Sequence, residues 1–298
     1  MISFHKAEAA DRVWAHEILK NCEYPGAEYA FSCMYLWSDY FGELGRVGDH
    51  LTQHASWRGR EVYLYPAGAG DIKGAIEAIR ADAAERGGPL RLRSLTKDKK
   101  EELEALYPGK FEFTACRNSY DYIYTVEELS ELHGKKLQSK RNHCNRFEAD
   151  FPEWRVLPLT RELLPRCRAF TEAWYRSHYT HNQDFSGERR AISTAFDHFD
   201  ELHMEGIALE TSEGVVAFSM GNRIREDTFD VNFEKARADI NGAYPMVNRE
   251  FARCIHEKYP QIRFLNREDD MGIAGLRQAK ESYFPDILLE KFIAEERK

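Results

Sequence analysis

The sequence predicts a mixed α/β (α+β) protein with two similar units in tandem, each built around a mixed central sheet flanked by helices. Strand-like and helix-like segments alternate along the chain, and their order in the second half repeats part of the order in the first. A chain of 298 residues is also long enough to bury two hydrophobic cores. We therefore expect two domains, residues 1–128 and 129–298, the second carrying the site.

In the first half, the β-rich runs EVYLYP and PLRLRSL alternate with two helical patterns, at 71–86 and around 97–107. The β-rich segment FEFTACRNSYDYIYTV follows. The turn AGAGDIKG matches neither of the two glycine-rich phosphate-binding motifs, G-x-G-x-x-G and the P-loop. We therefore expect a simple turn with Asp71 as the helix N-cap. The junction between the halves should fall near residues 125–133.

In the second half, three β-rich runs separated by short polar turns, EGIALET, EGVVAFSMGNRIR and DTFDVNF, predict an antiparallel meander. A helix is expected over 241–259, with Asn241 as N-cap and Pro260 just beyond its end. The strand QIRFLN, a helix over about 272–284 and the strand DILLEKFIA complete the order. AGAGDIKGA in the first half corresponds to ARADINGAY in the second, which indicates a duplication; the alternative is chance, since such alternation is common.

Composition restricts location and partners. Hydrophobic residues make up 43% of the chain, but no apolar run approaches the ~20 residues that cross a bilayer, and the start lacks the pattern of a secretory signal. The six cysteines are scattered without C-x-x-C spacing, which favours reduced thiols and a cytoplasmic location. The net charge of −8 argues against general polyanion binding, so any nucleic-acid contact should be local.

A basic segment at residues 133–151 is the first candidate site. On a helical wheel Lys140 falls inside the apolar stripe formed by Leu137, Cys144, Phe147 and Phe151. A lysine that points inward needs an anionic partner, so we expect contact with phosphate or RNA. The alternative is an ordinary basic surface helix whose Lys140 reaches solvent. The candidate phosphate-binding residues are Lys135, Lys136, Lys140, Arg141, Asn142 and Arg146.

The second candidate is the strand end and helix at 264–284, because ligands bind at strand C-termini in α/β folds. Its carboxylates suit a substrate ammonium or a general base, or they only stabilise the helix N-terminus. The cations of the helix suit phosphate or carboxylate, and Tyr283 suits proton donation to a leaving oxygen. The candidate substrate-binding residues are Asn266, Arg267, Glu268, Asp269, Asp270, Arg277 and Lys280.

The third candidate is a polar set on a strand and the following helix. Asp230 and Asn232 alternate with apolar residues and so share one face of a strand, while Asn248 lies on the apolar stripe of the helix. With Tyr283, these are the candidate catalytic residues. The alternative is a structural role in satisfying loop backbone. The turn at Gly242 could also present backbone N–H groups to an anion.

Other motifs predict little chemistry. His178, His181, His198 and His203 lack the spacing of a known metal site, so we expect no metal. The chain has no G-x-S-x-G elbow, and no cysteine lies in a recognisable nucleophile context.

Three segments carry a family resemblance: SKRNHCNRFEADFPEWRVLPLT, FDVNFEKARADINGAYPMVNREF and FLNREDDMGIAGLRQAKESYFPDILLEK. With them the chain resembles soluble proteins similar to the C-terminal domain of phosphatidylglycerol lysyltransferase. That family belongs with the Fem-type aminoacyltransferases, which consist of two tandem GNAT-like (N-acetyltransferase-like) folds. The resemblance covers nearly the whole chain and is strongest over 139–291.

The resemblance implies transfer of an amino acid from aminoacyl-tRNA to a lipid or amine acceptor, with no required cofactor. The basic residues would contact tRNA phosphates, and Glu268, Asp269 and Asp270 would hold the aminoacyl ammonium. The given residues show no counterpart of the membrane-embedded part of the full lysyltransferases, which leaves the acceptor open. Two alternatives stay open: an N-acyltransferase using acyl-coenzyme A between the splayed strands DTFDVNF and QIRFLN, although the usual pyrophosphate loop is not evident, and a non-catalytic protein that binds RNA or a nucleotide ligand.

The transferase hypothesis predicts where the candidate residues lie relative to one another. Asp230, Asn232, Asn248 and the segment 266–270 should converge on one pocket with Lys140, Arg277 and Tyr283.

Overall fold

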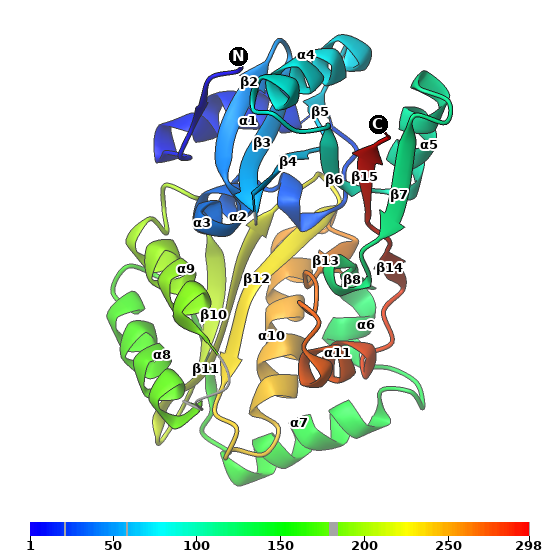
Figure 1. Ribbon diagram of the computed structural model, residues 1–298. Coiled ribbons are helices and arrows are strands. Elements are labelled where there is room, and N and C mark those ends of the chain that lie inside the picture. The colour runs from blue at the N-terminus through cyan, green and yellow to red at the C-terminus, as the bar shows by residue number, and fades with distance from the viewer. Residues whose placement is uncertain (21, 58, 179–183, 298) are drawn as a thin grey trace. The chain divides into compact units, whose positions relative to one another are not determined.

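A computed structural model describes residues 1–20, 22–57, 59–178 and 184–297, and its contacts divide the chain into two units. Unit 1 comprises Met1–Tyr122, Asp269–Arg277 and Leu288–Lys298, and unit 2 comprises Ile123–Glu268 and Gln278–Ile287. Each unit has a mixed sheet flanked by helices, which confirms the predicted fold class (Figure 1). All six cysteines are free thiols, as predicted. None of the helices in the described ranges is both long and apolar enough to cross a membrane.

The sheet of unit 1 has the strand order β1-β2-β3-β4-β6-β15-β7, with β5 paired to β3. Strands β4 and β6 run parallel, with Tyr63 opposite Leu92. The strands are β1 (Phe4–His5), β2 (Glu43–Val47), β3 (His50–Trp57), β4 (Arg60–Leu64), β5 (Ala67–Gly68), β6 (Arg91–Leu95), β7 (Phe111–Ala115) and β15 (Phe292–Glu296).

Helix α4 connects the parallel strands of unit 1. It begins where predicted, because the Asp71 carboxylate accepts the Gly74 N–H at 2.9 Å. Its inward side chains Ile76 and Ile79 are fully buried. The helices of this unit are α1 (Arg12–Leu19), α2 (Phe31–Leu36), α3 (Ser38–Phe41), α4 (Ile72–Glu85) and α5 (Lys97–Leu106), with short 3-10 turns at Ala9–Asp11, Ala27–Tyr29 and Arg117–Ser119.

The sheet of unit 2 has the strand order β14-β8-β13-β12-β11-β10-β9. Strands β10, β11 and β12 form the predicted antiparallel meander, and β12 and β13 run parallel. The strands are β8 (Asp121–Thr125), β9 (Arg155–Pro158), β10 (Glu205–Thr211), β11 (Gly214–Arg223), β12 (Thr228–Ala236), β13 (Phe264–Asn266) and β14 (Ile287–Leu289).

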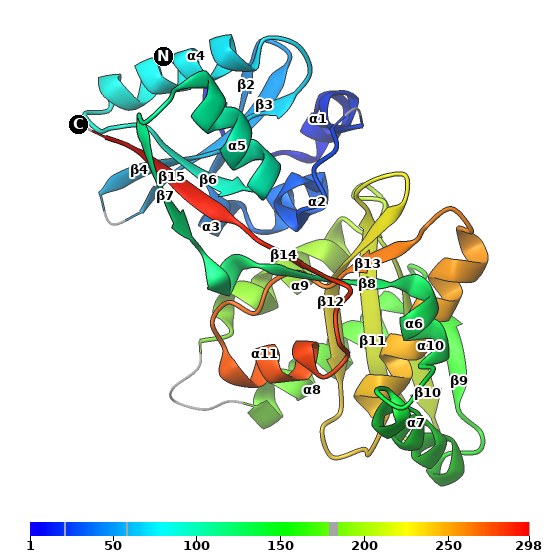
Figure 2. The ribbon, with the colours of Figure 1, turned by 90° about the vertical axis from the view of Figure 1, so that its right-hand side faces the viewer.

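Helices cover both faces of this second sheet (Figures 1 and 2). On one face, Phe218 of β11 packs against Phe170 of α8 and Phe196 of α9. On the other, Phe229 of β12 packs against Phe251 of α10, and α6 and α7 pack on α10. The helices are α6 (Val126–Glu131), α7 (Gln138–Asp150), α8 (Leu164–His178), α9 (Ser186–Asp197), α10 (Ala243–Lys258) and α11 (Ala274–Glu281).

The two halves repeat the order of parallel strand, helix and parallel strand, as β4–α4–β6 and β12–α10–β13. Two strands nevertheless join the sheet of the other half. β15, expected in the second domain, lies between β6 and β7, and β8, expected in the first, lies between β13 and β14. The predicted domains were continuous segments, whereas unit 1 includes two C-terminal segments. A β-rich pattern indicates a strand but not which sheet it joins.

The start of α10 differs from the prediction. Its N-cap is Gly242 in a left-handed conformation, not Asn241, and the side chain of Asn241 contacts His143 at 2.8 Å instead. A Cβ atom on Gly242 would lie 2.1 Å from the carbonyl oxygen of His143. Close packing of the α7 backbone therefore requires glycine at this position.

Candidate functional site

The candidate site of unit 2 lies where the parallel pairing of β12 and β13 stops. The last paired residues are Asp230 and Asn266, and β12 then continues to Ala236 beside β11. Near this point β12 has an extra residue, because Met220 of β11 lies opposite Phe233 while Asn222 lies opposite Asp230. A Cβ atom at the intervening Gly221 would lie 1.8 Å from the Asp230 carbonyl oxygen. The result is a β-bulge, a feature common beside functional sites.

The bulge lets β12 present polar side chains in two directions. Phe229 packs against α10, and Glu234 also contacts α10 through Asn248. Residues five apart on a regular strand would point to opposite faces, so the bulge has changed the alternation. Asp230 therefore points away from the α10 side, whereas Glu234 points towards it.

The first polar group contains two carboxylates bridged by one amide. The Asn232 amide nitrogen donates to Asp230 at 2.8 Å and to Glu268 at 3.1 Å. Glu268 has a left-handed backbone (φ 56°), and its N–H donates to the side-chain oxygen of Asn266 at 2.8 Å. Asp230 and Asn266 are fully buried. Two carboxylates held this close favour a positively charged ligand.

The second polar group is centred on Arg267, on the α10 side. Its guanidinium donates to Glu234 at 2.9 Å and lies over the rings of Tyr283 and Tyr124, at 4.9 and 5.6 Å from their centroids. Asn248 donates to the other oxygen of Glu234 at 3.0 Å. Glu234 is thus fixed by two donors, while Asn248 contacts Glu234 rather than sharing the first group.

Lys140 adds a second cation to this group. Its ammonium donates to Ser282 at 2.7 Å and lies 4.0 Å from the centroid of the Tyr283 ring. Burial and the neighbouring Arg267 both lower the pKa of Lys140. Leu137, Cys144 and Phe147 of the predicted stripe are buried, so Lys140 points inward as the sequence indicated.

Lys280 completes the cluster. Its ammonium donates to the carbonyl of Arg267, and its own carbonyl accepts the Tyr124 hydroxyl at 2.7 Å. The cluster therefore contains three cations and a single carboxylate, Glu234, which pairs directly with Arg267. A compact group with this excess of positive charge suits an anion. We call Lys140, Arg267, Lys280, Glu234, Asn248 and Tyr283 the cation cluster.

Three polar atoms in these two groups are buried without a hydrogen-bond partner among the described residues. They are the side-chain oxygens of Asn232 and Asn248 and one terminal nitrogen of Arg267. Buried polar atoms normally have partners, and leaving one unsatisfied costs ~1–3 kcal/mol. Such atoms are where donors and acceptors of a bound ligand are expected.

Asp270 and Arg277 form a separate, internally satisfied group within unit 1. Asp270 accepts two hydrogen bonds from Arg277 at 2.8 and 2.9 Å, one from Tyr122 at 2.6 Å, one from Arg117 at 3.1 Å and one from the Gly272 N–H at 2.8 Å. Its side chain is fully buried. These donors leave no oxygen for a substrate ammonium, so the role expected for Asp270 is replaced by one in fixing the loop.

The expected convergence is therefore met only in part. Asp230, Asn232, Asn266 and Glu268 form one group of unit 2, and Lys140, Asn248, Arg267, Lys280 and Tyr283 form the other. Asp269 belongs to unit 1, like Asp270 and Arg277, and contributes to the electrostatic environment of Lys291.

Replacing Asp270 by asparagine should lower the free energy of unfolding by about 1.5–3 kcal/mol, because charge-assisted hydrogen bonds are lost. Burial alone would raise the pKa of Asp270, but its donors, led by Arg277, hold the pKa well below its usual range. This stabilisation is present above the unfolded-state pKa of ~3.9 and is lost as the pH falls below it. Urea unfolding should show a constant difference between the two proteins from pH 6 to 8 and a smaller one below about pH 4; a pH-independent difference would contradict this role.

Two other residues of the predicted basic site make contacts within the chain, and three are exposed. Arg141 donates to the carbonyls of Leu132 and Gly134, and Arg146 pairs with Asp150 at 2.9 Å. Lys135, Lys136 and Asn142 are exposed. Of the six candidates, only Lys140 is a member of the cation cluster as defined above.

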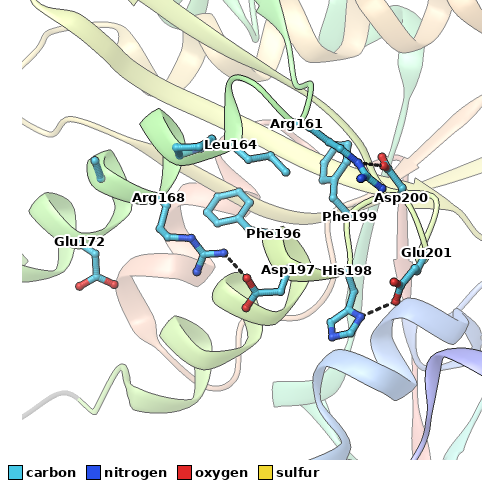
Figure 3. Close-up of a pocket in the computed structure, with 12 residues that line it drawn as sticks. Arg161, Leu164, Arg168, Glu172, Phe196, Asp197, His198, Phe199, Asp200 and Glu201 are labelled. Carbon is cyan, nitrogen blue, oxygen red and sulfur yellow. Dashed lines mark hydrogen bonds and ion pairs between the residues drawn. The ribbon is translucent and has the colours of Figure 1, made fainter.

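A groove of about 710 Å³ lies between α8 and α9. Its charged side chains pair with one another, Arg168 with Asp197 at 2.6 Å and His198 with Glu201 at 2.6 Å (Figure 3). These pairs leave little net charge for a ligand. Within the described ranges no three His, Cys, Asp or Glu residues group as metal ligands; His181 and the side chain of His178 lie outside them.

Sequence reasoning missed Glu234 and Ser282. In the sequence Glu234 continues the alternation of Asp230 and Asn232, which marks it as a third polar residue of the strand but not the face to which the bulge turns it. Ser282 lies only two residues after Lys280, so helical spacing does not place the two on one face. No other local pattern indicates a role for Ser282.

The fold and the strand-end groups define the class of the protein. Two units, each with a helix connecting parallel strands of a mixed sheet, constitute the tandem GNAT-like fold of the Fem-type proteins. Two solved structures have a similar fold. The TM-score is 0.68 with L-PGS from Bacillus licheniformis (17% identity, 100% of this chain and 95% of that chain) and 0.59 with FemX (9% identity, 97% and 96%).

The chain belongs to the family described as phosphatidylglycerol lysyltransferase, C-terminal, whose model matches residues 20–295. It is homologous to transferases. A conserved protein of unknown function from Bacteroides thetaiotaomicron VPI-5482 is 33% identical over 100% of both chains, with a TM-score of 0.94. An uncharacterized protein of Mycoplasmoides gallisepticum is 24% identical over 185 residues, which are 59% of this chain and 56% of that protein. The matched region thus spans little more than half of that curated relative.

Proposed function

We propose that the protein is an aminoacyltransferase, which moves an aminoacyl group from aminoacyl-tRNA to a lipid or amine acceptor. The observation that carries this proposal is the position of two oppositely charged groups at one strand end, the Asp230–Asn232–Glu268 group and the cation cluster. The 3′ end of an aminoacyl-tRNA carries the matching charges, an α-ammonium and a phosphodiester. The family assignment supports the same donor.

The reaction needs alignment more than activation, because the tRNA ester is already activated. A hydroxyl or amine of the acceptor attacks the ester carbonyl, the bond to the tRNA ribose oxygen breaks, and the acceptor's proton ends on that oxygen. Lys140 and Arg267 supply positive charge for the oxyanion that forms during attack. Burial raises the pKa of Tyr283, which keeps its hydroxyl protonated and able to donate.

Three observations disfavour coenzyme A as donor. A pyrophosphate bound at the start of α10 would need backbone N–H groups there, but Pro245 in the first turn has none. The space beside Gly242 is filled by the carbonyl of His143. The pair of carboxylates, buried Asp230 and half-buried Glu268, also has no counterpart in an uncharged acyl group, whereas it suits an α-ammonium.

The test uses the purified protein with total tRNA charged with labelled amino acids, and separate assays with phospholipid vesicles and with soluble amines. Donor-dependent appearance of label in the lipid or amine fraction supports the proposal. Release of coenzyme A from acyl-coenzyme A under the same conditions would replace it. Binding of aminoacyl-tRNA without transfer to any acceptor would indicate a binding protein.

Replacing Lys140 by methionine should lower the transfer rate by about 10²-fold, the usual effect of removing one preorganised charge from a reaction site. Methionine has an unbranched apolar side chain of similar length to the stem of lysine, so the free energy of unfolding should change little. The matched control is Lys97→Met, because Lys97 is exposed in unit 1. Equal rates for the two variants would remove Lys140 from the mechanism.

A further inference from the structure

Unit 1 has a polar pair at the end of its own parallel strands, which the proposed reaction does not use. Arg93 is the last residue of β6 that pairs with β4, where it lies opposite Leu64. Its guanidinium donates to the side-chain oxygen of Gln53, in β3, at 2.9 Å. Both residues belong to unit 1, so the pair is separate from the two polar groups of unit 2. Ends of parallel strands are where α/β folds usually bind ligands.

The register of the sheet places Arg93 and Gln53 on one face. Tyr63 of β4 faces α4, since its hydroxyl donates to Asp82 of that helix at 2.9 Å. Gln53 and Arg93 each lie one position along the chain from a residue that is opposite Tyr63. Because neighbouring residues of a strand point to opposite faces, both side chains point away from α4.

The charge of Arg93 has no carboxylate in direct contact among the described residues. The guanidinium donates to three neutral oxygens: the side-chain oxygen of Gln53, the carbonyl of Phe41 at 3.3 Å and the hydroxyl of Ser94 at 3.3 Å. These hydrogen bonds use Nη1 and Nη2, which leaves the Nε–H. Arg93 is half-buried, so a molecule from solvent can reach it.

Glu28 is the carboxylate whose charge acts on Arg93, but it is already engaged. One of its oxygens accepts from Ser94 at 2.9 Å and the other from Lys291 at 2.6 Å. Burial lowers the pKa of Arg93, and Glu28 does not fully offset this effect. Charged groups that are removed from water are normally paired with an opposite charge. The position beside Arg93 therefore favours an anion.

Gln53 provides a second, independent observation. Its side chain is fully buried, and the amide nitrogen has no hydrogen-bond partner among the described residues. Arg93 requires an acceptor from this amide, which fixes the oxygen towards the guanidinium and the nitrogen away from it. A buried donor without a partner is rare in folded proteins. The unused N–H groups are thus two kinds of donor, and neither residue offers a free acceptor.

A structural role accounts for part of this arrangement. Arg93 lies at the C-terminal end of the short helix α3, where a cation is favourable, and its guanidinium carbon is 4.9 Å from the centroid of the Phe41 ring. These contacts do not account for the amide nitrogen of Gln53. The alternative to a ligand is a water molecule that accepts from this nitrogen.

We propose that Arg93 and Gln53 bind the carboxylate of a small molecule in unit 1. One carboxylate oxygen accepts from the Gln53 amide and the other from the Nε–H of Arg93. A carboxylate brings acceptors only and a single negative charge, which suits two donors and one cation. A phosphate brings more oxygens and more charge than these donors satisfy. The inference goes beyond the proposed function and does not depend on it.

The experiment measures equilibrium dialysis of the full chain against radiolabelled acetate, with the ionic strength held constant by sodium chloride. We expect saturable binding. Acetate at ten times its dissociation constant should raise the melting temperature by about 3–6 °C. Acetamide, which has a similar shape but no charge, and inorganic phosphate should bind at least about tenfold more weakly.

Two variants of Gln53 test the site without removing the arginine. Gln53→Leu should weaken acetate binding by about 10–100-fold, the effect of losing one hydrogen bond to a charged group. Gln53→Glu should abolish binding and raise the melting temperature, because its own carboxylate pairs with Arg93. The matched control is Gln261→Leu, since Gln261 is exposed and lies in unit 2; it should bind acetate like the unmodified protein.

Lys140→Met is included because the cation cluster of unit 2 also attracts anions. Acetate binding that Lys140→Met removes, and that both Gln53 variants leave unchanged, would assign acetate to the cation cluster and overturn the proposal. Absence of saturable binding, or equal binding of acetamide, would overturn it as well. The assay contains no aminoacyl-tRNA and requires no turnover, so its outcome is independent of whether the transfer reaction is confirmed.

Discussion

Replacing Arg267 by methionine should reduce aminoacyl transfer by about 10²–10³-fold and lower the free energy of unfolding by about 3–5 kcal/mol. The guanidinium pairs with Glu234 at 2.9 Å and lies over Tyr283 and Tyr124. Both side chains of the ion pair are largely buried, with exposures of 12% and 11%. Methionine fills similar space but leaves Glu234 without its cation, which is why the loss of stability should be large.

A second variant separates stability from activity. Adding Glu234→Gln to Arg267→Met removes the unpaired charge, so the double variant should regain most of the lost free energy of unfolding. Urea unfolding measures this gain, while the rate of aminoacyl transfer should stay low. Arg161→Met is the control, because Arg161 is 78% exposed and pairs with the exposed Asp200; its effect on stability should stay within about 0.5 kcal/mol. Full activity in the double variant would show that Arg267 only supports the fold.

Local patterns were sufficient to predict the elements that form this site. Helical spacing predicted α7 with Lys140 on its apolar side, and the alternation of polar and apolar residues predicted that Asp230 and Asn232 share a direction. The start of α4 at Asp71 followed from its capping preference. These features depend on residues within a few positions of one another, which is the range over which a single sequence is informative.

Features that depend on distant residues could not be predicted in this way. The bulge of β12 requires Gly221 of the neighbouring strand, and it is the bulge that separates Glu234 from Asp230. Two of the donors to Asp270, Arg117 and Tyr122, lie about 150 positions earlier in the chain. Carboxylates that precede a helix have the same local sequence whether they bind a ligand or fix a loop, so only their tertiary partners distinguish the two roles.

Both units have a left-handed residue in or just after the second of their two parallel strands. In unit 2, the left-handed Glu268 follows β13 and contacts the Asn232 amide. In unit 1, Ser94 of β6 is likewise left-handed (φ 62°), and its hydroxyl donates to Glu28 at 2.9 Å. There the carboxylates of Glu28 and Asp121 hold the chain's own Lys291, each at 2.6 Å. The chain thus fills with its own ammonium the kind of paired-carboxylate position that we propose to bind the substrate ammonium in unit 2.

Replacing Lys291 by methionine should therefore lower the free energy of unfolding by about 3–5 kcal/mol without removing any residue of the proposed reaction site. Lys291 and its two partners are nearly fully buried, with exposures of 3%, 8% and 1%, so the variant leaves two carboxylates buried without a cation. The exposed Lys97→Met should change stability by no more than about 0.5 kcal/mol. Unfolding by urea measures both effects.

The pH dependence of the Lys291 effect follows from the direction of its shift. Burial alone lowers the pKa of Lys291, but Asp121 and Glu28 outweigh it and raise the pKa well above its usual value. A raised pKa in the folded state stabilises fully below the unfolded-state value of ~10.4, and this stabilisation is lost as the pH rises through the folded-state value. The difference in stability between the unmodified protein and Lys291→Met should accordingly stay constant from pH 6 to 9. A difference that shrinks within that range would mean that Lys291 is not held as an ammonium by these two carboxylates.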